Sequence, residues 1–396
     1  MTISSAVAAK PSGEHPMLAA IRELAPKVAP RSEEIETARR LPADLARELA
    51  QAGVFRMAVP EAYGGLELHP TLIVEAIESL SRADASAGWC AMIGSLTAIC
   101  SAWLPEAEAR LIYGDPEVIT GGVAAPMGRA ELVEGGYRVT GRWPWASGSQ
   151  NCRWLAGGVV VMKDGRPRML GENVPEVRVL FFPIEDVTLH DTWHAAGLCG
   201  TGSGDMEVKD VFVPAGRSLS FFTERPRLDR PLYGMPPFGM LALGIPSVAL
   251  GIARRAIDEL KALALQKKIM PAGRHLLATR PAVQEAVAEA EATLRAARAF
   301  LFETVNTMFE AASRREVSVH HRAELRLACT HTTRSAARAV DRMYEAAGGT
   351  AVYRASPLQR CLRDIHVATQ HGMVAPPTLE TIGGVLLGLD AHAVML

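Results

Sequence analysis

The sequence predicts an α+β protein in three parts: an N-terminal helical domain, a central β domain and a C-terminal helical bundle. Apolar residues recur at three- and four-residue spacing through about residues 17–113, which is the helical period. Near residue 118 the pattern changes to short alternating runs, and near residue 225 it becomes helical again in alanine-rich stretches. We therefore expect domains at residues 1–117, 118–224 and 225–396.

The central segment carries strand signals. The stretch Glu131-Leu-Val-Glu-Gly-Gly-Tyr-Arg-Val-Thr140 has two alternating runs around Gly-Gly, which predicts a hairpin. Further strand candidates cover residues 155–162, 177–182 and 206–213. Short strands at fairly even spacing indicate a small β-barrel or sandwich.

The C-terminal segment follows a charged linker punctuated by proline, which begins at Glu224. We expect helices over residues 245–265, 281–312 and 322–347, and a fourth from Pro357. Long alanine-rich helices usually pack as a bundle, and their faces often make oligomer contacts.

Composition excludes several classes of protein. The chain has 396 residues, of which 48% are hydrophobic, so it can build a large core. A net charge of −1 without a long basic run argues against binding to nucleic acid or anionic membranes. The six cysteines form no CxxC pair, and there is no signal peptide. Because proline or charge interrupts the most apolar stretches, and no HExxH is present, we expect a cytoplasmic protein with no membrane span and no bound metal.

Three segments then point to a family. They are Gly141-Arg-Trp-Pro-Trp-Ala-Ser-Gly148, Ala196-Gly-Leu-Cys-Gly-Thr-Gly-Ser-Gly-Asp205, and Glu345-Ala-Ala-Gly-Gly349 followed by Pro357-Leu-Gln-Arg-Cys-Leu-Arg-Asp364. In this order they resemble the acyl-CoA dehydrogenase superfamily across most of the chain. The resemblance implies the acyl-CoA dehydrogenase fold, with a central β-barrel domain and a C-terminal four-helix bundle, and a homotetramer.

The catalytic base of the dehydrogenases is missing. In that family a glutamate after the Arg-Asp pair removes the α-proton of the acyl-CoA, but the corresponding position here is Gly372, beside His371. Another known position for the base corresponds to Leu241. Dehydrogenation needs a base within hydrogen-bond reach of the proton, and neither position supplies one.

Other residues resemble the two-component (group D) flavin-dependent monooxygenases, which share the fold. These are Trp145-Ala-Ser-Gly148, His371 and the stretch Ala83-Asp-Ala-Ser-Ala-Gly-Trp89. The resemblance implies an oxygenase component that uses reduced flavin (FMNH2 or FADH2) and O2 to hydroxylate a small aromatic or phenolic substrate through a C4a-hydroperoxyflavin. A separate NAD(P)H-dependent flavin reductase would supply the reduced flavin. The choice between FMN and FAD, the substrate, and carbon, nitrogen or sulfur oxygenation all stay open.

The resemblance also assigns cofactor-binding residues. It places Ser147 beside the flavin N5, where a hydroxyl can donate and accept, and Trp145 on or near the isoalloxazine. The remaining candidates for holding the flavin are Gly148, Thr201, Gly348 and Gly349. The glycine-rich run at 200–205 precedes a strand instead of opening a helix, so it is not a dinucleotide fingerprint. The alternative for Ser147 is an ordinary turn residue.

His371 is the second catalytic candidate, because a histidine can hydrogen-bond a peroxide or take the proton of a phenol. Its alternative is a histidine satisfied within the core. His366 competes, since it lies five residues earlier, and we place it with Trp89 in the substrate pocket. Plain core packing is the alternative for Trp89.

Two other functions stay open at this point. One is an acyl-CoA dehydrogenase with a displaced base. The other is a non-catalytic protein of the flavoenzyme fold that serves as an assembly partner.

Overall fold

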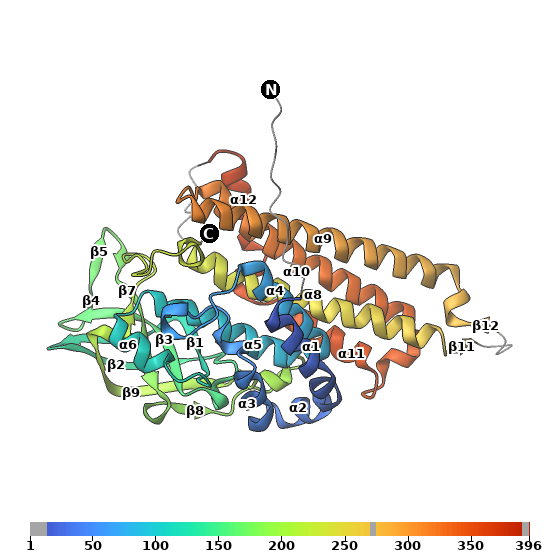
Figure 1. The fold of residues 1–396 in the computed structure, drawn as a ribbon, viewed down its shortest axis with the longest axis horizontal. Coiled ribbons are helices and arrows are strands. Elements are labelled where there is room, and N and C mark those ends of the chain that lie inside the picture. Colours follow the sequence, from blue (N-terminus) through green and yellow to red (C-terminus); the bar gives the residue numbers. More distant parts are fainter. Residues whose placement is uncertain (1–13, 270–274, 390–395) are drawn as a thin grey trace.

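The structure is a computed structural model that describes residues 14–269, 275–389 and 396. It has the three predicted parts in the predicted order (Figure 1). The strands of the central part lie at one end of the molecule, and the long helices of the C-terminal part extend towards the other end, where β11 (Lys268–Ile269) and β12 (His275–Leu276) lie (Figure 1). The element type changes between Tyr113 and Thr120, and again between Leu219 and Pro231. The exact domain limits stay a prediction.

The N-terminal part is helical, as predicted. Its α-helices are α1 (Pro16–Val28), α2 (Ser32–Ala38), α3 (Ala43–Gln51), α4 (Pro70–Ala83), α5 (Ala85–Thr97) and α6 (Glu106–Tyr113). Helix α5 begins after Asp84, because the carboxylate of Asp84 accepts a hydrogen bond from the Ala87 N–H at 2.9 Å and satisfies a free donor of the first turn. Almost the whole of α5 is buried, and it carries Trp89 into the interior.

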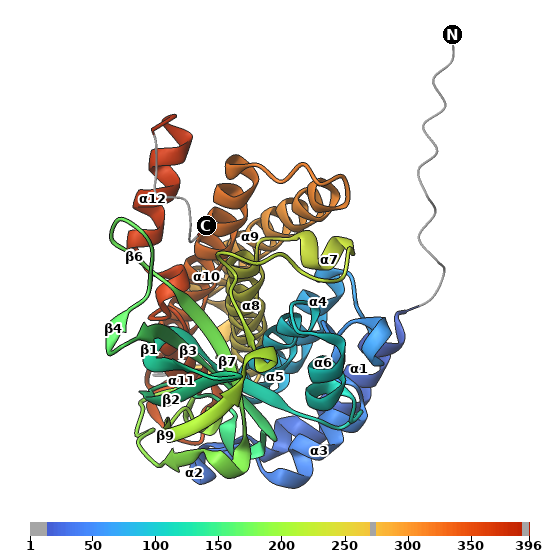
Figure 2. The ribbon, with the colours of Figure 1, turned by 90° about the vertical axis from the view of Figure 1, so that its left-hand side faces the viewer.

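The central part contains the predicted hairpin and strands. The strands are β1 (Thr120–Val133), β2 (Gly136–Trp143), β3 (Trp154–Lys163), β4 (Arg166–Pro167), β5 (Met169–Gly171), β6 (Val174–Pro175), β7 (Val177–Pro183), β8 (Thr188–His190), β9 (Asp205–Pro214) and β10 (Ser218–Leu219). Strands β1 and β2 pair antiparallel across the turn that follows Val133, whereas β1 and β3 run parallel. The main strand order is β10-β7-β3-β1-β2-β9-β8. The strands make a mixed sheet (Figure 2). Among the described residues β10 and β8 stand at the two ends of its strand order, and this sheet forms the central β domain that the sequence predicted as a small barrel or sandwich.

The C-terminal part is the predicted helical bundle. Its helices are α7 (Pro231–Gly234), α8 (Pro237–Ala264), α9 (Pro281–Ser313), α10 (Val319–Ala347), α11 (Pro357–Ala368) and α12 (Pro377–Leu386), and the short strands β11 (Lys268–Ile269) and β12 (His275–Leu276) join α8 to α9. Helix α10 packs against α8, α9, α11 and α12.

Glycines let α4, α5 and α8 approach closely. A Cβ atom at Gly88 would lie 1.8 Å from the Ser81 Oγ, and one at Gly251 would lie 2.4 Å from the Glu78 carbonyl oxygen. Any larger residue would force these helices apart, since interiors are close-packed. This close packing fixes the position of α5, and therefore the position of the buried Trp89 side chain that it carries.

Two stretches are long and apolar enough to cross a membrane: residues 85–102 and helix α8. The expectation that proline or charge would break up such stretches is therefore wrong, and Pro246 lies inside α8. The two stretches are 89% and 83% buried within the fold, as core helices are.

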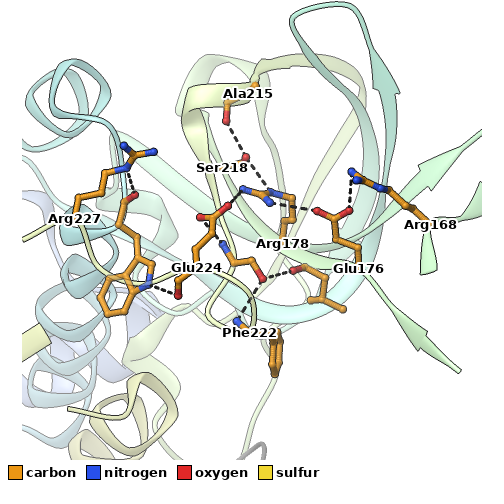
Figure 3. Close-up of polar contacts among 11 residues, drawn as sticks. Arg168, Glu176, Arg178, Ala215, Ser218, Phe222, Glu224 and Arg227 are labelled. Atoms are coloured by element: carbon orange, nitrogen blue, oxygen red, sulfur yellow. Dashed lines mark hydrogen bonds and ion pairs between the residues drawn. The ribbon is translucent and has the colours of Figure 1, made fainter. Parts of the chain in front are cut away.

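The linker between β10 and α7 is held by a partly buried charged cluster, which we call the linker network: Arg168, Glu176, Arg178 and Glu224 (Figure 3). The guanidinium of Arg178, on β7, lies 2.5 Å from a carboxylate oxygen of Glu224 and 3.3 Å from one of Glu176. The Trp103 Nε1 donates to the Glu224 carbonyl oxygen at 3.4 Å. The network thus fixes the linker against both the sheet and the N-terminal helices.

Candidate active site

Three hydroxyl groups and one indole form a continuous hydrogen-bonded chain at the junction of the helices and the sheet. The Trp89 Nε1 lies 3.1 Å from the Ser147 Oγ, which lies 2.6 Å from the Ser203 Oγ. The Ser203 Oγ lies 2.6 Å from the Thr201 Oγ1, and Thr201 donates to the Leu198 carbonyl oxygen at 2.8 Å. We call Ser147, Ser203 and Thr201 the hydroxyl chain. All three side chains are buried.

Two loops supply the hydroxyl chain, and backbone hydrogen bonds join them. Ser147 lies after β2, and Thr201 and Ser203 lie just before β9. The Gly148 N–H donates to the Thr201 carbonyl oxygen at 2.8 Å, and Gly148 has a φ of +71°, a region that glycine occupies without strain. The two loops therefore form one rigid unit.

The Arg-Asp pair of α11 positions the second loop. A carboxylate oxygen of Asp364 accepts the Leu198 N–H at 2.6 Å, and the Arg363 guanidinium donates to the Ala196 carbonyl oxygen at 2.6 Å. A Cβ atom at Gly197 would lie 2.3 Å from the Arg363 carbonyl oxygen, so only glycine allows this contact. Burial raises the pKa of Asp364 to about 7, although the hydrogen bond from Leu198 opposes the shift.

Trp145 stands on the outer side of the same loop. Its side chain is 62% exposed, and its φ is +65°, which is uncommon for a residue with a bulky side chain. Such backbone strain costs on the order of 1–3 kcal/mol and is typical of ligand sites. An exposed indole two residues from Ser147 is available for a planar ligand to stack on.

His371 lies close to Trp89. The centroids of the two rings are 6.0 Å apart, with the ring planes tilted by 55°. The His371 Nδ1 accepts a hydrogen bond from the Met373 N–H at 3.2 Å, which caps the short helical turn Gly372–Val374. Burial, and next the Arg326 guanidinium, lower the pKa of His371 to about 4. At neutral pH the ring is therefore uncharged, with Nδ1 as the acceptor and Nε2 as the donor.

The structure thus brings Ser147, Thr201, Trp89 and His371 together, and Gly148 and Trp145 adjoin them. It places the other candidates elsewhere. His366 is exposed on α11 and contacts Asp341 at 2.8 Å. Gly348 and Gly349 are exposed at the end of α10, where the Ala347 carbonyl oxygen accepts from Lys267. No contact within the described ranges joins these three residues to the hydroxyl chain, and their roles stay predictions.

Ser203 is the site residue that sequence reasoning missed. The sequence feature that could have indicated it is the pair of hydroxyl residues in Thr201-Gly-Ser203, within the glycine-rich run at 200–205. Leu241 lies half-buried on α8, so that position offers no carboxylate either. Within the part of the chain that the structure describes, no three or more His, Cys, Asp or Glu side chains are grouped to hold a metal ion.

Comparisons with known proteins identify the family. The N-terminal domain of acyl-CoA dehydrogenases matches residues 13–105, and their C-terminal domain matches residues 243–376. An indole-3-acetate monooxygenase of Pseudomonas putida is 35% identical, covering 97% of this chain and 95% of the other. The oxygenase component of an FADH2-dependent resorcinol hydroxylase from Rhizobium sp. is 32% identical over 90% of each chain.

Solved structures agree. The crystal structure of the 3-HSA hydroxylase from Rhodococcus sp. RHA1 superposes with a TM-score of 0.89 at 29% identity, covering 97% of this chain and 100% of the other. The chain belongs to the acyl-CoA dehydrogenase superfamily. Within that superfamily it is a flavin-dependent monooxygenase, an oxygenase component that uses reduced flavin and O2. The dehydrogenase alternative is not favoured.

Proposed function

We propose that the chain hydroxylates a small aromatic substrate at the surface formed by Trp89, Ser147 and His371. The main observation in support is that the Trp89 indole donates a hydrogen bond to Ser147 and lies next to His371. Trp89 therefore connects Ser147 and His371, the two residues proposed to be catalytic, which lie far apart in the sequence. The relatives that act on indole-3-acetate and resorcinol support an aromatic substrate.

The residues fit a reduced flavin. Ser147 would hold the flavin at N5, and the exposed Trp145 indole would pack on or near the isoalloxazine, beside Gly148 and Thr201. When bound, the reduced flavin activates O2 and delivers one oxygen atom to the substrate. The buried loops keep bulk water away from Ser147, since hydrogen bonds gain strength where water is excluded.

His371 would act as a hydrogen-bond donor through Nε2–H. Its Nδ1 is occupied by the Met373 N–H, and its pKa is lowered to about 4. The ring can therefore hold an oxygen atom of the bound oxygen species or of the substrate. Of the two roles considered from the sequence, this arrangement supports hydrogen bonding over removal of a phenol proton.

The system would need a partner. The glycine-rich run at 200–205 leads into strand β9 and does not open a helix, so it does not serve NAD(P)H. We propose a separate NAD(P)H-dependent flavin reductase, a cytoplasmic location and a homotetramer. Either FMNH2 or FADH2 would serve, and the FADH2-dependent relative favours FADH2.

The test is hydroxylation with chemically reduced flavin. The purified chain is mixed anaerobically with FADH2 or FMNH2 and with indole-3-acetate, resorcinol or another phenol, and then exposed to O2. We expect hydroxylated product with one oxygen atom from 18O2. A wild-type protein that binds reduced flavin but hydroxylates none of a broad aromatic panel would defeat the proposal.

A second arm addresses His371. The His371→Ala variant should release more hydrogen peroxide per flavin consumed, about tenfold for the loss of one hydrogen bond. His320→Ala, an exposed change at the start of α10, is the control. Unchanged coupling in His371→Ala would remove His371 from the mechanism.

A further inference from the structure

We propose that Thr201 and Ser203 fix the direction of the Ser147 hydroxyl, so that it can only accept a hydrogen bond at the flavin N5. The site would then select flavin that carries a proton on N5 and disfavour oxidised flavin. This inference rests on the proposed binding of flavin at Ser147. It gives Ser203 a role that the sequence did not reveal, as a positioning residue.

The two ends of the hydroxyl chain determine its direction. At one end, the Leu198 carbonyl oxygen has no proton, so Thr201 must donate to it. At the other end, the Trp89 indole N–H has no lone pair, so it must donate to Ser147. Neither end can be reversed.

The middle of the hydroxyl chain follows by counting protons, since each hydroxyl has one. Thr201 uses its proton on Leu198, so Ser203 donates to Thr201. Ser203 then has none left, so Ser147 donates to Ser203. Ser147 also accepts from Trp89, which leaves one lone pair and no proton for a ligand.

The Leu198 end of the hydroxyl chain is held in place by further hydrogen bonds. The Leu198 carbonyl oxygen accepts a second side-chain hydrogen bond, from the Trp193 Nε1 at 3.0 Å, and the Leu198 N–H is held by Asp364. Thr201 is 1% exposed, and Ser147 and Ser203 are each 5% exposed. Because the three side chains are almost fully buried, reversing a hydroxyl would leave a donor or acceptor within the chain unsatisfied.

The chemical consequence lies at N5. In reduced flavin N5 carries a hydrogen and donates, which matches the free lone pair of Ser147. In oxidised flavin N5 has only a lone pair, so the two lone pairs would face each other. The hydroxyl chain therefore favours entry of reduced flavin and release of the oxidised form after turnover.

The experiment measures dissociation constants for oxidised and dithionite-reduced flavin, under anaerobic conditions, for FMN and FAD. Ser203→Ala frees the Ser147 proton, and Thr201→Val lets Ser203 turn towards Ser147. Each variant should bind oxidised flavin more tightly and lower the preference for the reduced form by about tenfold. Thr201→Ser keeps the hydroxyl and should keep the preference.

Thr332→Val is the matched control. Thr332 is fully buried on α10 and donates to the Ala297 carbonyl oxygen at 3.1 Å, away from the site. It should keep the wild-type preference. Unchanged preference in folded Ser203→Ala and Thr201→Val would overturn the inference while leaving the proposed function intact. Failure of the wild type to bind any reduced flavin would instead defeat the proposed function.

A probe that needs no variant covers the case in which these substitutions prevent folding. In oxidised 5-deaza-FMN a C–H group replaces the N5 lone pair. The wild-type protein should bind this analogue severalfold more tightly than oxidised FMN. Equal affinity would contradict the assigned direction of the hydroxyl.

Discussion

Two polar clusters of this molecule, one buried and one partly buried, are built from different chemistry. The hydroxyl chain is neutral: hydroxyls and an indole N–H hold one another, and one acceptor lone pair on Ser147 is left over. The linker network is charged, and its two arginines and two glutamates are paired with one another (Figure 3). The first cluster can accept one more hydrogen bond, whereas in the second each carboxylate is already paired with an arginine.

Burial explains the difference. A buried charge without a partner costs several kcal/mol, so a charged cluster must be satisfied within the protein. A neutral acceptor that waits for a ligand costs less, of the order of 1–3 kcal/mol. A ligand site built from neutral hydroxyls can therefore stay unfilled without unfolding, and the linker network can use charges because they are paired within the protein.

The largest effect should come from breaking the linker network. Arg178→Met removes the cation between Glu176 and Glu224, whose side chains are 7% and 35% exposed. We expect a loss of about 2 kcal/mol in the free energy of unfolding, because Glu224 loses its arginine and the buried Glu176 keeps only Arg168, whose side chain is 48% exposed. Urea denaturation followed by circular dichroism measures it, with flavin preference unchanged.

The control for Arg178 is Arg138→Met in the same sheet. Arg138 pairs with Asp210 at 3.5 Å, but the two side chains are 50% and 80% exposed, so we expect a change within about 1 kcal/mol. If Arg178→Met cost no more than this control, the linker network would be an ordinary surface ion pair.

A smaller effect, on flavin binding and not on folding stability, should follow from Ser147→Ala. Without the hydroxyl, reduced flavin loses its partner at N5, and the Trp89 N–H and Ser203 lose theirs. We expect about tenfold weaker binding of reduced flavin and a higher fraction of oxygen released as hydrogen peroxide. Ser149→Ala is the control, since Ser149 is buried in the same loop but lies outside the hydroxyl chain. Equal losses in both variants would mean that the loop, and not the hydroxyl, is responsible.

The sequence predicted the helices, the hairpin and the strands well, because each has a local period or turn signal. It predicted a central β domain, a small barrel or sandwich, but not the order of its strands, since strand order depends on contacts between distant segments. Similarly, the motifs identify Ser147, Trp89 and His371, but they do not predict that the Trp89 indole contacts both Ser147 and His371. The direction of the hydroxyl chain could not be predicted, because it depends on the Leu198 carbonyl, whose position is set by Asp364 from another domain.

The smallest predicted effect concerns His371 and acidity. Its pKa is about 4 in the folded protein, against an ordinary value of 6.5. Between these values the unfolded chain binds more protons than the folded one, so the stability present above pH 6.5 is lost as the pH falls towards 4. From pH 7 to pH 5.5 the wild type should lose about 1 kcal/mol more than His371→Gln, which has no such proton to take up.

Urea denaturation at the two pH values checks this prediction, with His320→Gln, an exposed change at the start of α10, expected to follow the wild type. The same neutral ring means that coupling of oxygen to product should not change through His371 between pH 6 and 8. An inflection near pH 6.5 that disappears in His371→Gln would show a ring that ionises freely. Protonation of Nδ1 would then remove the acceptor of the Met373 N–H. His371 would act as a charged group, like the residues of the linker network, and not as a neutral one.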